Sequence, residues 1–136
     1  MTPEHSSRVQ KRPRALIVED EILVAWQLQS TLEDLGFEAD ELVSNGTSAL
    51  NLVQSGSFEV LFMDVNLSGP PDGAETAQRL REFSDTPIVF VTAYSHYDSI
   101  YTGLRRITRS AVVGKPATPS AITEALRELG LATPGH

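Results

Sequence analysis

The 136-residue sequence contains no cysteine, and this absence excludes disulfides, cysteine-ligated zinc and thiol catalysis. No apolar run approaches the roughly 20 residues that a membrane-spanning helix needs. The N-terminus carries Glu4 and His5 where a secretory signal would have an apolar segment. We therefore expect a cytoplasmic protein that makes no membrane contact.

Basic residues are scarce outside the first 14 positions. Those positions hold four Lys or Arg residues against the single acid Glu4, whereas the whole chain carries a formal net charge of −7. The remainder is therefore strongly acidic, at about −10. Because nucleic-acid binding needs clustered Lys and Arg to contact phosphates, we expect no nucleic acid as a partner.

What the sequence does contain is the composition of one globular domain. Apolar residues make up 40% and charged residues 21% of the 136 positions, which suits a single hydrophobic core. Residues 1–13 mix proline, serine and charge without periodicity, which is typical of a flexible leader. We therefore divide the chain into a leader at 1–13, one domain at 14–130 and a short tail at 131–136.

Short apolar runs alternate five times with amphipathic segments, which predicts five strands and five helices. Gly36 ends the first helix, whereas Thr118 and Pro119 begin the last one and Gly130 ends it. Strands that are apolar on both faces are typical of a parallel sheet covered by helices on both sides, so we predict an α/β domain of five βα units. The expected strands are 15–18, 38–43, 60–63, 88–91 and 111–113, and the expected helices are 21–35, 47–54, 74–83, 99–106 and 119–129.

Polar residues directly follow four of the predicted strands. Glu19 and Asp20 follow the first strand, Asp64 the third, Thr92 the fourth, and Lys115 comes after the fifth. In open parallel sheets, ligands bind at the carboxyl ends of the strands. We therefore expect these five side chains to meet at one edge of the sheet.

Each of these residues also has a purely structural interpretation. Asp20 could serve only as the N-cap of the next helix, Thr92 could be an ordinary strand end, and Lys115–Pro116 could be a turn. Asp64 is harder to explain in this way, because it follows four apolar residues and precedes Val65, so that burial would demand a partner. Their occurrence together, at the ends of four strands, favours a common site.

The three acids predict a divalent cation. Glu19, Asp20 and Asp64 would repel one another at close range, and a bound cation removes that penalty. Carboxylate oxygens suit Mg²⁺, whereas a chain with three histidines and no cysteine is a poor candidate for zinc. Lys115 could pair with Asp64 at rest and bind a phosphoryl oxygen after Asp64 is modified, and the Thr92 hydroxyl could bind the same group.

Over residues 14–130 the sequence resembles the receiver domains of two-component response regulators, of the stand-alone single-domain type. The resemblance rests on Leu16–Glu21, on Asp64–Leu67 with Asp72–Gly73 downstream, on Val91–Ala93 and on Lys115–Pro116. It implies a doubly wound, flavodoxin-like sheet of five parallel strands in the order 2-1-3-4-5.

The resemblance also implies a role for each matching residue. Asp64 would accept the phosphoryl group, and Mg²⁺ would be the cofactor. The implied roles of the others are main Mg²⁺ ligand for Asp20, direct or water-mediated ligand for Glu19, ligand through its backbone carbonyl for Asn66, switch hydroxyl for Thr92, and phosphate-binding lysine for Lys115, which would precede a cis bond to Pro116.

The sequence departs from the family pattern at three places. Glu19 stands where many receivers have aspartate, the loop 67–73 is about one residue longer than usual, and Val112 occupies the position of the usual aromatic switch residue. The segment Phe90–Tyr94 partially resembles a receiver subgroup whose fourth strand reads Phe-Ala-Thr-Gly-x-Tyr. Our hypothesis is that Tyr94 or Tyr97 replaces the missing switch ring, and the alternative is that both tyrosines only pack or lie at the surface.

As a bacterial receiver, the protein would take its phosphoryl group from a sensor histidine kinase or a phosphotransfer protein. It would be a phosphoacceptor and not an enzyme, apart from self-phosphorylation by small donors and slow autodephosphorylation. Only 130–136 follow the last helix, so we expect the output to be another protein, reached by relay, docking or phosphate drainage. The resemblance implies a partner surface at helix 21–35 and beside strands four and five, with the response in 93–110.

Two other functions remain open at this point. One is a phosphorylation-independent binding module with a vestigial acidic pocket. The other is a flavin or nucleotide binder of the same fold, which would need a Gly-rich or Ser/Thr-rich phosphate loop after the first strand. The acidic run 19–21 would repel such a phosphate, so we rank this function last.

Overall fold

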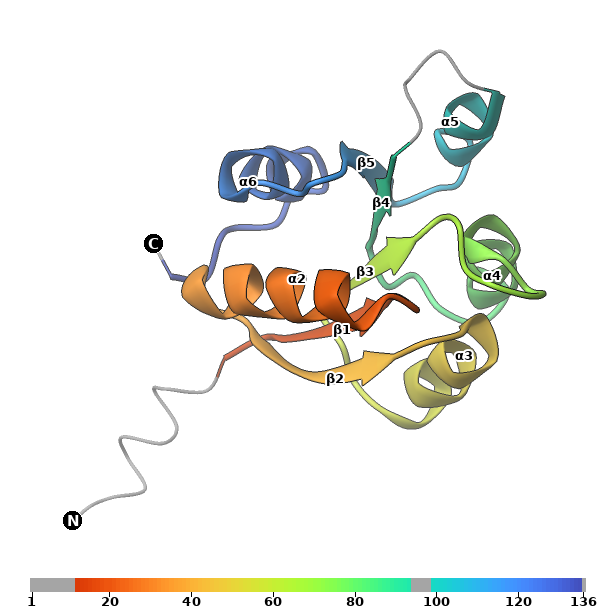
Figure 1. The fold of residues 1–136 in the computed structure, drawn as a ribbon, viewed down its shortest axis with the longest axis horizontal. Helices are drawn as coiled ribbons and strands as arrows, with labels where there is room; N and C mark the ends of the chain where they lie inside the picture. The colour runs from red at the N-terminus through yellow and green to blue at the C-terminus, as the bar shows by residue number, and fades with distance from the viewer. Residues whose placement is uncertain (1–11, 94–98, 136) are drawn as a thin grey trace.

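A computed structural model describes residues 12–93 and 99–135, and it contains one five-stranded parallel sheet (Figure 1). The strand order is β2-β1-β3-β4-β5, which confirms the predicted doubly wound topology. Each predicted strand is present within one residue at either end. The strands are β1 (Arg14–Val18), β2 (Glu38–Val43), β3 (Val60–Asp64), β4 (Ile88–Thr92) and β5 (Ser110–Gly114).

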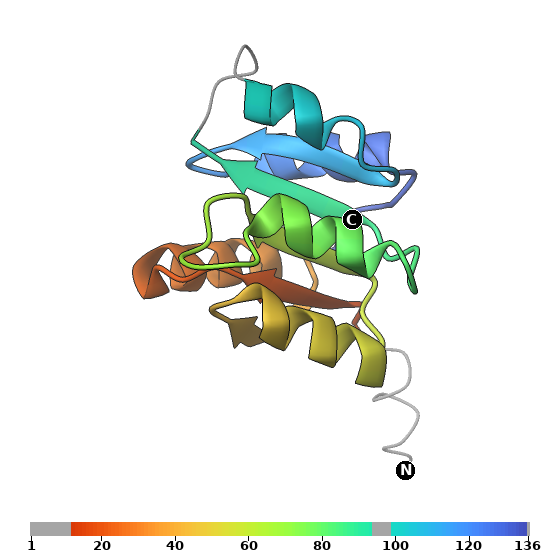
Figure 2. The same cartoon turned by 90° about the vertical axis from the view of Figure 1, so that its right-hand side faces the viewer.

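Helices cover both faces of the sheet, as the two-sided apolar strands predict. One face is covered by α2 (Ile22–Asp34) and α6 (Pro119–Glu128). The opposite face is covered by α3 (Gly46–Ser55), α4 (Gly73–Leu80) and α5 (Ser99–Leu104), which stand in front of the sheet in Figure 2. Among the described residues, no helix is both long and apolar enough to cross a membrane.

The alternation of side chains along each strand divides the core into two clusters. In β1, Ile17 points into the cluster under α2 and α6, whereas Leu16 and Val18 point into the cluster under α3, α4 and α5. Phe62 and Phe90, each fully buried, belong to opposite clusters. Packing on both sides therefore holds the central strands rigidly, and these are the strands that end at the candidate site.

Local sequence explains where the helices begin and end. Asp72 and Glu75 form a capping box at the start of α4, and Asn45 caps α3 by accepting a hydrogen bond from the Ser48 amide. Thr118 caps α6 with Pro119 next in the chain, as predicted. Gly36, predicted to end the first helix, has a φ of +104°, in the left-handed region that favours glycine.

The tail reaches back to the first helix. Within 131–135, Leu131 packs against the cluster under α2 and α6, and the Gly135 amide donates a hydrogen bond of 2.8 Å to the Leu35 carbonyl. The proposed boundaries at 14 and 130 stay predictions, and residues 1–11 of the expected leader lie outside the described residues.

Candidate functional site

The parallel register brings the predicted site residues to one edge of the sheet. Val18 pairs with Met63, Asp64 with Val91, and Thr92 with Gly114, so that these strands end at the same level. Glu19, Asp64 and Thr92 are buried, with 5%, 4% and 2% of their surface exposed. The structure thus places three polar side chains at the end of an apolar core, as the sequence predicts.

Lys115 joins two of the acids. Its Nζ lies 3.2 Å from Glu19 Oε1 and 3.3 Å from Asp64 Oδ1, and the Lys115 amide donates a 2.9 Å hydrogen bond to the Thr92 carbonyl. Partial burial works to lower the pKa of Lys115, but the carboxylates of Asp64 and Glu19 outweigh it and hold that pKa above its usual value. Lys115 is therefore a fixed positive charge beside the Asp64 carboxylate.

For Glu19, in contrast to Lys115, the surroundings disfavour the charged form of the side chain. Burial raises the pKa of Glu19, and the nearby Asp64 carboxylate raises it further, although the Glu21 amide donates a 3.2 Å hydrogen bond to Glu19 Oε2. Oxygen atoms of Glu19, Asp20 and Asp64 all lie within 4.8 Å of one another. Three hard oxygen donors at this separation, with excess negative charge, fit Mg²⁺.

Asp20 is held by a residue that the sequence analysis missed. Its Oδ2 accepts hydrogen bonds from the Ser68 amide at 3.0 Å and from the Ser68 hydroxyl at 2.5 Å. Both bonds lower the pKa of Asp20, and the bond from the Ser68 hydroxyl has the larger effect. The N-cap position of α2 belongs to Glu21, which makes no side-chain cap, so the interpretation of Asp20 as a helix cap is wrong.

Asp64 is fixed by its own loop and by the start of α4. The Asn66 amide donates a 3.1 Å hydrogen bond to Asp64 Oδ1, and the Gly73 amide donates a 3.0 Å bond to the Val65 carbonyl. A Cβ on Gly73 would lie 2.4 Å from the Asp64 carbonyl oxygen, so only glycine allows this approach. The proposed metal bond from the Asn66 carbonyl stays a prediction.

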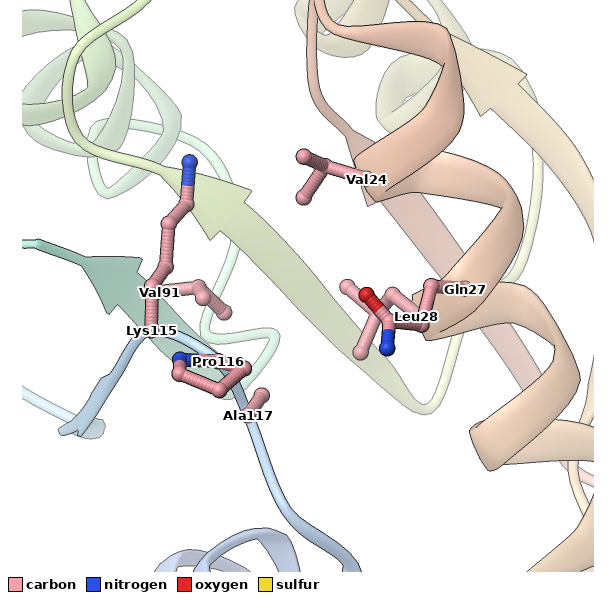
Figure 3. Close-up of a pocket in the computed structure, with 7 residues that line it drawn as sticks. All are labelled: Val24, Gln27, Leu28, Val91, Lys115, Pro116 and Ala117. Atoms are coloured by element: carbon pink, nitrogen blue, oxygen red, sulfur yellow. The ribbon is translucent and has the colours of Figure 1, made fainter.

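Two hollows adjoin Lys115. The first, with a volume of about 560 Å³, is the acidic pocket lined by Asp20, Glu21, Asp64, Asn66, Ser68, Ala93 and Lys115. The second, of about 230 Å³, is mostly apolar and lies between α2 and the segment after β5 (Figure 3). In this second hollow Val24, Gln27 and Leu28 face Val91 and the Lys115–Ala117 segment.

Of the three residues considered for the aromatic switch role, the structure describes only Val112. Val112 lies in β5 opposite Phe90 and packs, half-buried, against the cluster under α3, α4 and α5. An aliphatic side chain therefore fills the place of the usual aromatic residue. Tyr94 and Tyr97 lie outside the described residues. The Lys115–Pro116 bond is cis, as the resemblance implied, and Pro70–Pro71 is a second cis bond that was not predicted.

Comparisons with known proteins agree with this geometry. A family model described as the response regulator receiver domain matches residues 15–127. The chain is 38% identical over 80 residues to the transcriptional activator protein IrlR of Burkholderia pseudomallei, covering 59% of this chain and 34% of that protein. It is 33% identical over 91 residues to the sensor histidine kinase GacS of Pseudomonas protegens, covering 62% and 10% respectively.

Among solved structures, the signal receiver domain of a modulated diguanylate cyclase from Desulfovibrio desulfuricans is similar to this chain. It has a TM-score of 0.75 at 29% identity, and the match covers 88% of this chain and 98% of that one. The chain therefore spans nearly all of an isolated domain of this kind but only about a third, or less, of the two curated relatives described above.

Proposed function

This chain belongs to the response regulator receiver domain family, and from that membership we propose that it accepts a phosphoryl group on Asp64. The observation that carries the proposal is the environment of Asp64. A carboxylate with 4% of its surface exposed ends a buried strand, lies 3.3 Å from Lys115 and opens onto the acidic pocket. A buried carboxylate with a paired cation and room beside it is suited to phosphoryl transfer.

In the proposed reaction, an oxygen of Asp64 attacks the phosphorus of a phosphohistidine on a histidine kinase or phosphotransfer protein. The new oxygen–phosphorus bond forms as the nitrogen–phosphorus bond breaks, and the imidazole leaves. Lys115 keeps its positive charge beside the oxygens of the transferred group, and the Thr92 hydroxyl binds one of them. Water later attacks the acyl phosphate, which releases inorganic phosphate and restores the Asp64 carboxylate.

We assign Mg²⁺ to Glu19, Asp20 and Asp64, with the Asn66 carbonyl as a further ligand. The carboxylate oxygens of the three acids are close enough to share one cation. When bound, Mg²⁺ neutralises charge on the transferred phosphoryl group. The protein's own contribution is to hold the three carboxylates together at the cost of mutual repulsion, which raises the affinity for a divalent ion.

The partner surface proposed at the first helix is supported by the exposed side chains of α2. Ile22, Leu23 and Trp26 expose 53%, 72% and 55% of their surface, although they are large and apolar. The apolar hollow of Figure 3 continues from α2 to Lys115, which also lines the acidic pocket. A phosphodonor bound over α2 would therefore lie next to the pocket that Asp64 lines.

We further propose that the chain is a cytoplasmic, bacterial phosphoacceptor that signals through protein contacts, without catalysis beyond its own phosphorylation and dephosphorylation. The response would occur in 93–110, with Tyr94 or Tyr97 as the switch ring. The kind of output depends on the partner protein. Phosphate relay, docking to a target and phosphate drainage from a kinase can be distinguished once that partner is identified.

The direct test is the intact mass of the protein after incubation with acetyl phosphate and Mg²⁺. We expect a gain of about 80 Da, one phosphoryl group, which is absent in Asp64→Asn and absent when a chelator replaces Mg²⁺. An equal gain in Asp64→Asn would exclude Asp64 as the acceptor. No gain, together with partner binding that Asp64→Asn leaves unchanged, would favour the phosphorylation-independent binding module.

The flavin or nucleotide function finds no support at the corresponding loop. Asp20 and Glu21, which follow β1, line the pocket with carboxylates where that function needs backbone or hydroxyl donors for a phosphate. A purified protein without yellow colour and without bound nucleotide would exclude it.

A further inference from the structure

Ser68 connects two segments that are distant in sequence but adjacent at the site. Through its amide and its hydroxyl, it donates two hydrogen bonds to the same oxygen, Asp20 Oδ2, across a separation of 48 residues. Ser68 lies in the loop between β3 and α4, whereas Asp20 lies between β1 and α2. The contact therefore ties the two loops that line the acidic pocket.

Asp20 needs such a contact more than the other two acids do. Glu19 and Asp64 are buried and both pair with Lys115. Asp20 is half-buried, lies outside these two ion pairs and does not cap α2, whose N-cap position is Glu21. Without Ser68, its carboxylate would turn more freely at the mouth of the pocket, and ordering it again would cost conformational entropy.

The choice of oxygen has a chemical consequence. Both donors of Ser68 meet Oδ2, which leaves Oδ1 as the oxygen without these bonds. Donors that bind one oxygen of a carboxylate orient the other toward a metal, and loss of such an outer contact commonly weakens metal binding by about 10-fold to 100-fold. The two donors also stabilise the negative charge that Asp20 needs in order to bind a metal ion.

We propose that Ser68 is a positioning residue that holds Asp20 in the orientation in which it binds Mg²⁺. The proposal rests on the proposed function, because it assumes that the three acids share a cation. It adds a residue outside the ligand set, contributed by the loop between β3 and α4.

The test is a Mg²⁺ titration of the full chain, followed by amide chemical shifts in NMR spectra. In Ser68→Ala, which loses the hydroxyl donor but keeps the amide, we expect the dissociation constant for Mg²⁺ to rise about 10-fold. Ser68→Thr restores a hydroxyl and should bind within about twofold of the parent. Ser55→Ala, the same chemical change at the exposed end of α3, should leave the dissociation constant unchanged.

A second measurement separates positioning from a general effect on folding. Because Ser68 is exposed, Ser68→Ala should unfold in chelator at a temperature close to that of the parent. Mg²⁺ binding by Ser68→Ala that equals or exceeds the parent's would overturn the proposal, and tighter binding would mean that Ser68 competes with the metal. If the parent itself binds no Mg²⁺, both this inference and the metal site of the proposed function are wrong. If the parent binds Mg²⁺ and Ser68→Ala binds it equally well, only this inference is wrong.

Discussion

The two halves of this molecule carry very different charge. Residues 15–78, which run from the second residue of β1 into α4, contain twelve acids and no lysine, arginine or histidine, whereas 79–136 contain seven Lys or Arg residues and five acids. The acids of the first half are Glu19, Asp20, Glu21, Glu33, Asp34, Glu38, Asp40, Glu41, Glu59, Asp64, Asp72 and Glu75.

This difference explains how the site is assembled. The first half supplies Glu19, Asp20 and Asp64 but no cation to balance them, and the second half supplies Lys115 at the end of β5. Because one lysine cannot neutralise three carboxylates, the arrangement retains excess negative charge. The first half therefore supplies the carboxylates of the site and the second half supplies Lys115, and the remaining negative charge is what the proposed Mg²⁺ would balance.

We expect the largest difference between the halves in the stability of two glycine-to-alanine variants, one in each half. Gly73 begins α4, and a Cβ there would lie 2.4 Å from the Asp64 carbonyl oxygen, whereas a Cβ on Gly103 in α5 would meet none of the described residues within 4 Å. We expect Gly73→Ala to lower the free energy of unfolding by about 3 kcal/mol through overpacking. Gly103→Ala should raise it by about 0.5 kcal/mol through helix propensity. Urea denaturation measures both, and equal effects would show that the first half is not packed more tightly at the site.

The second prediction tests whether the acidic half is under electrostatic strain. The pKa of Glu19 is raised in the folded protein, mainly by burial, so ionised Glu19 destabilises the fold at neutral pH and protonation relieves this. In chelator, Glu19→Gln should raise the free energy of unfolding by about 1 kcal/mol near pH 7. The gain should fade as the pH falls through the raised pKa and be lost below the ordinary value of 4.5.

Urea denaturation across this pH range checks the prediction, with the exposed Glu21→Gln as the matched control. Adding Mg²⁺ should stabilise the parent more than Glu19→Gln, because the variant lacks one carboxylate. A loss of stability in Glu19→Gln at neutral pH would instead mean that the ion pair with Lys115 outweighs burial.

We expect the smallest changes in stability from charge substitutions at the C-terminal ends of two helices, one in each half. In the first half, α2 ends at Asp34 with no basic residue in its last turn, whereas α6 in the second half has Arg127 there, paired with Glu124. An acid opposes the helix dipole at this end and a base complements it. Asp34→Asn should raise, and Arg127→Gln should lower, the free energy of unfolding by about 0.5 kcal/mol each.

Thermal unfolding at low salt, and again in about 1 M NaCl, checks this pair of variants. Both effects should shrink in the high-salt buffer because the groups are exposed to solvent. Effects of the same sign in the two variants would contradict an origin in the helix dipole.

The fold was predictable because local patterns and packing requirements agree. Strands such as β1 and β3 are apolar on both faces, and the signals at Thr118 and Pro119 and at Gly36 mark helix ends whose geometry the structure confirms. The helix ends were less exact: α4 was expected to reach Phe83 but ends at Leu80, and Arg81 to Phe83 continue as turns. Such terminal turns depend on tertiary packing, which a periodic pattern does not encode.

By itself, the sequence determined the chemical composition of the site. Acids, a hydroxyl and a lysine follow strands whose ends must meet in any parallel sheet, so their convergence follows from topology. Only the tertiary structure decided which pairs touch: that Lys115 bonds Glu19 as well as Asp64, and that Ser68 holds Asp20. The reason is physical, since these contacts depend on how two loops fold over the edge of the sheet, and loop positions are set by side-chain packing and hydrogen bonding between residues distant in the chain.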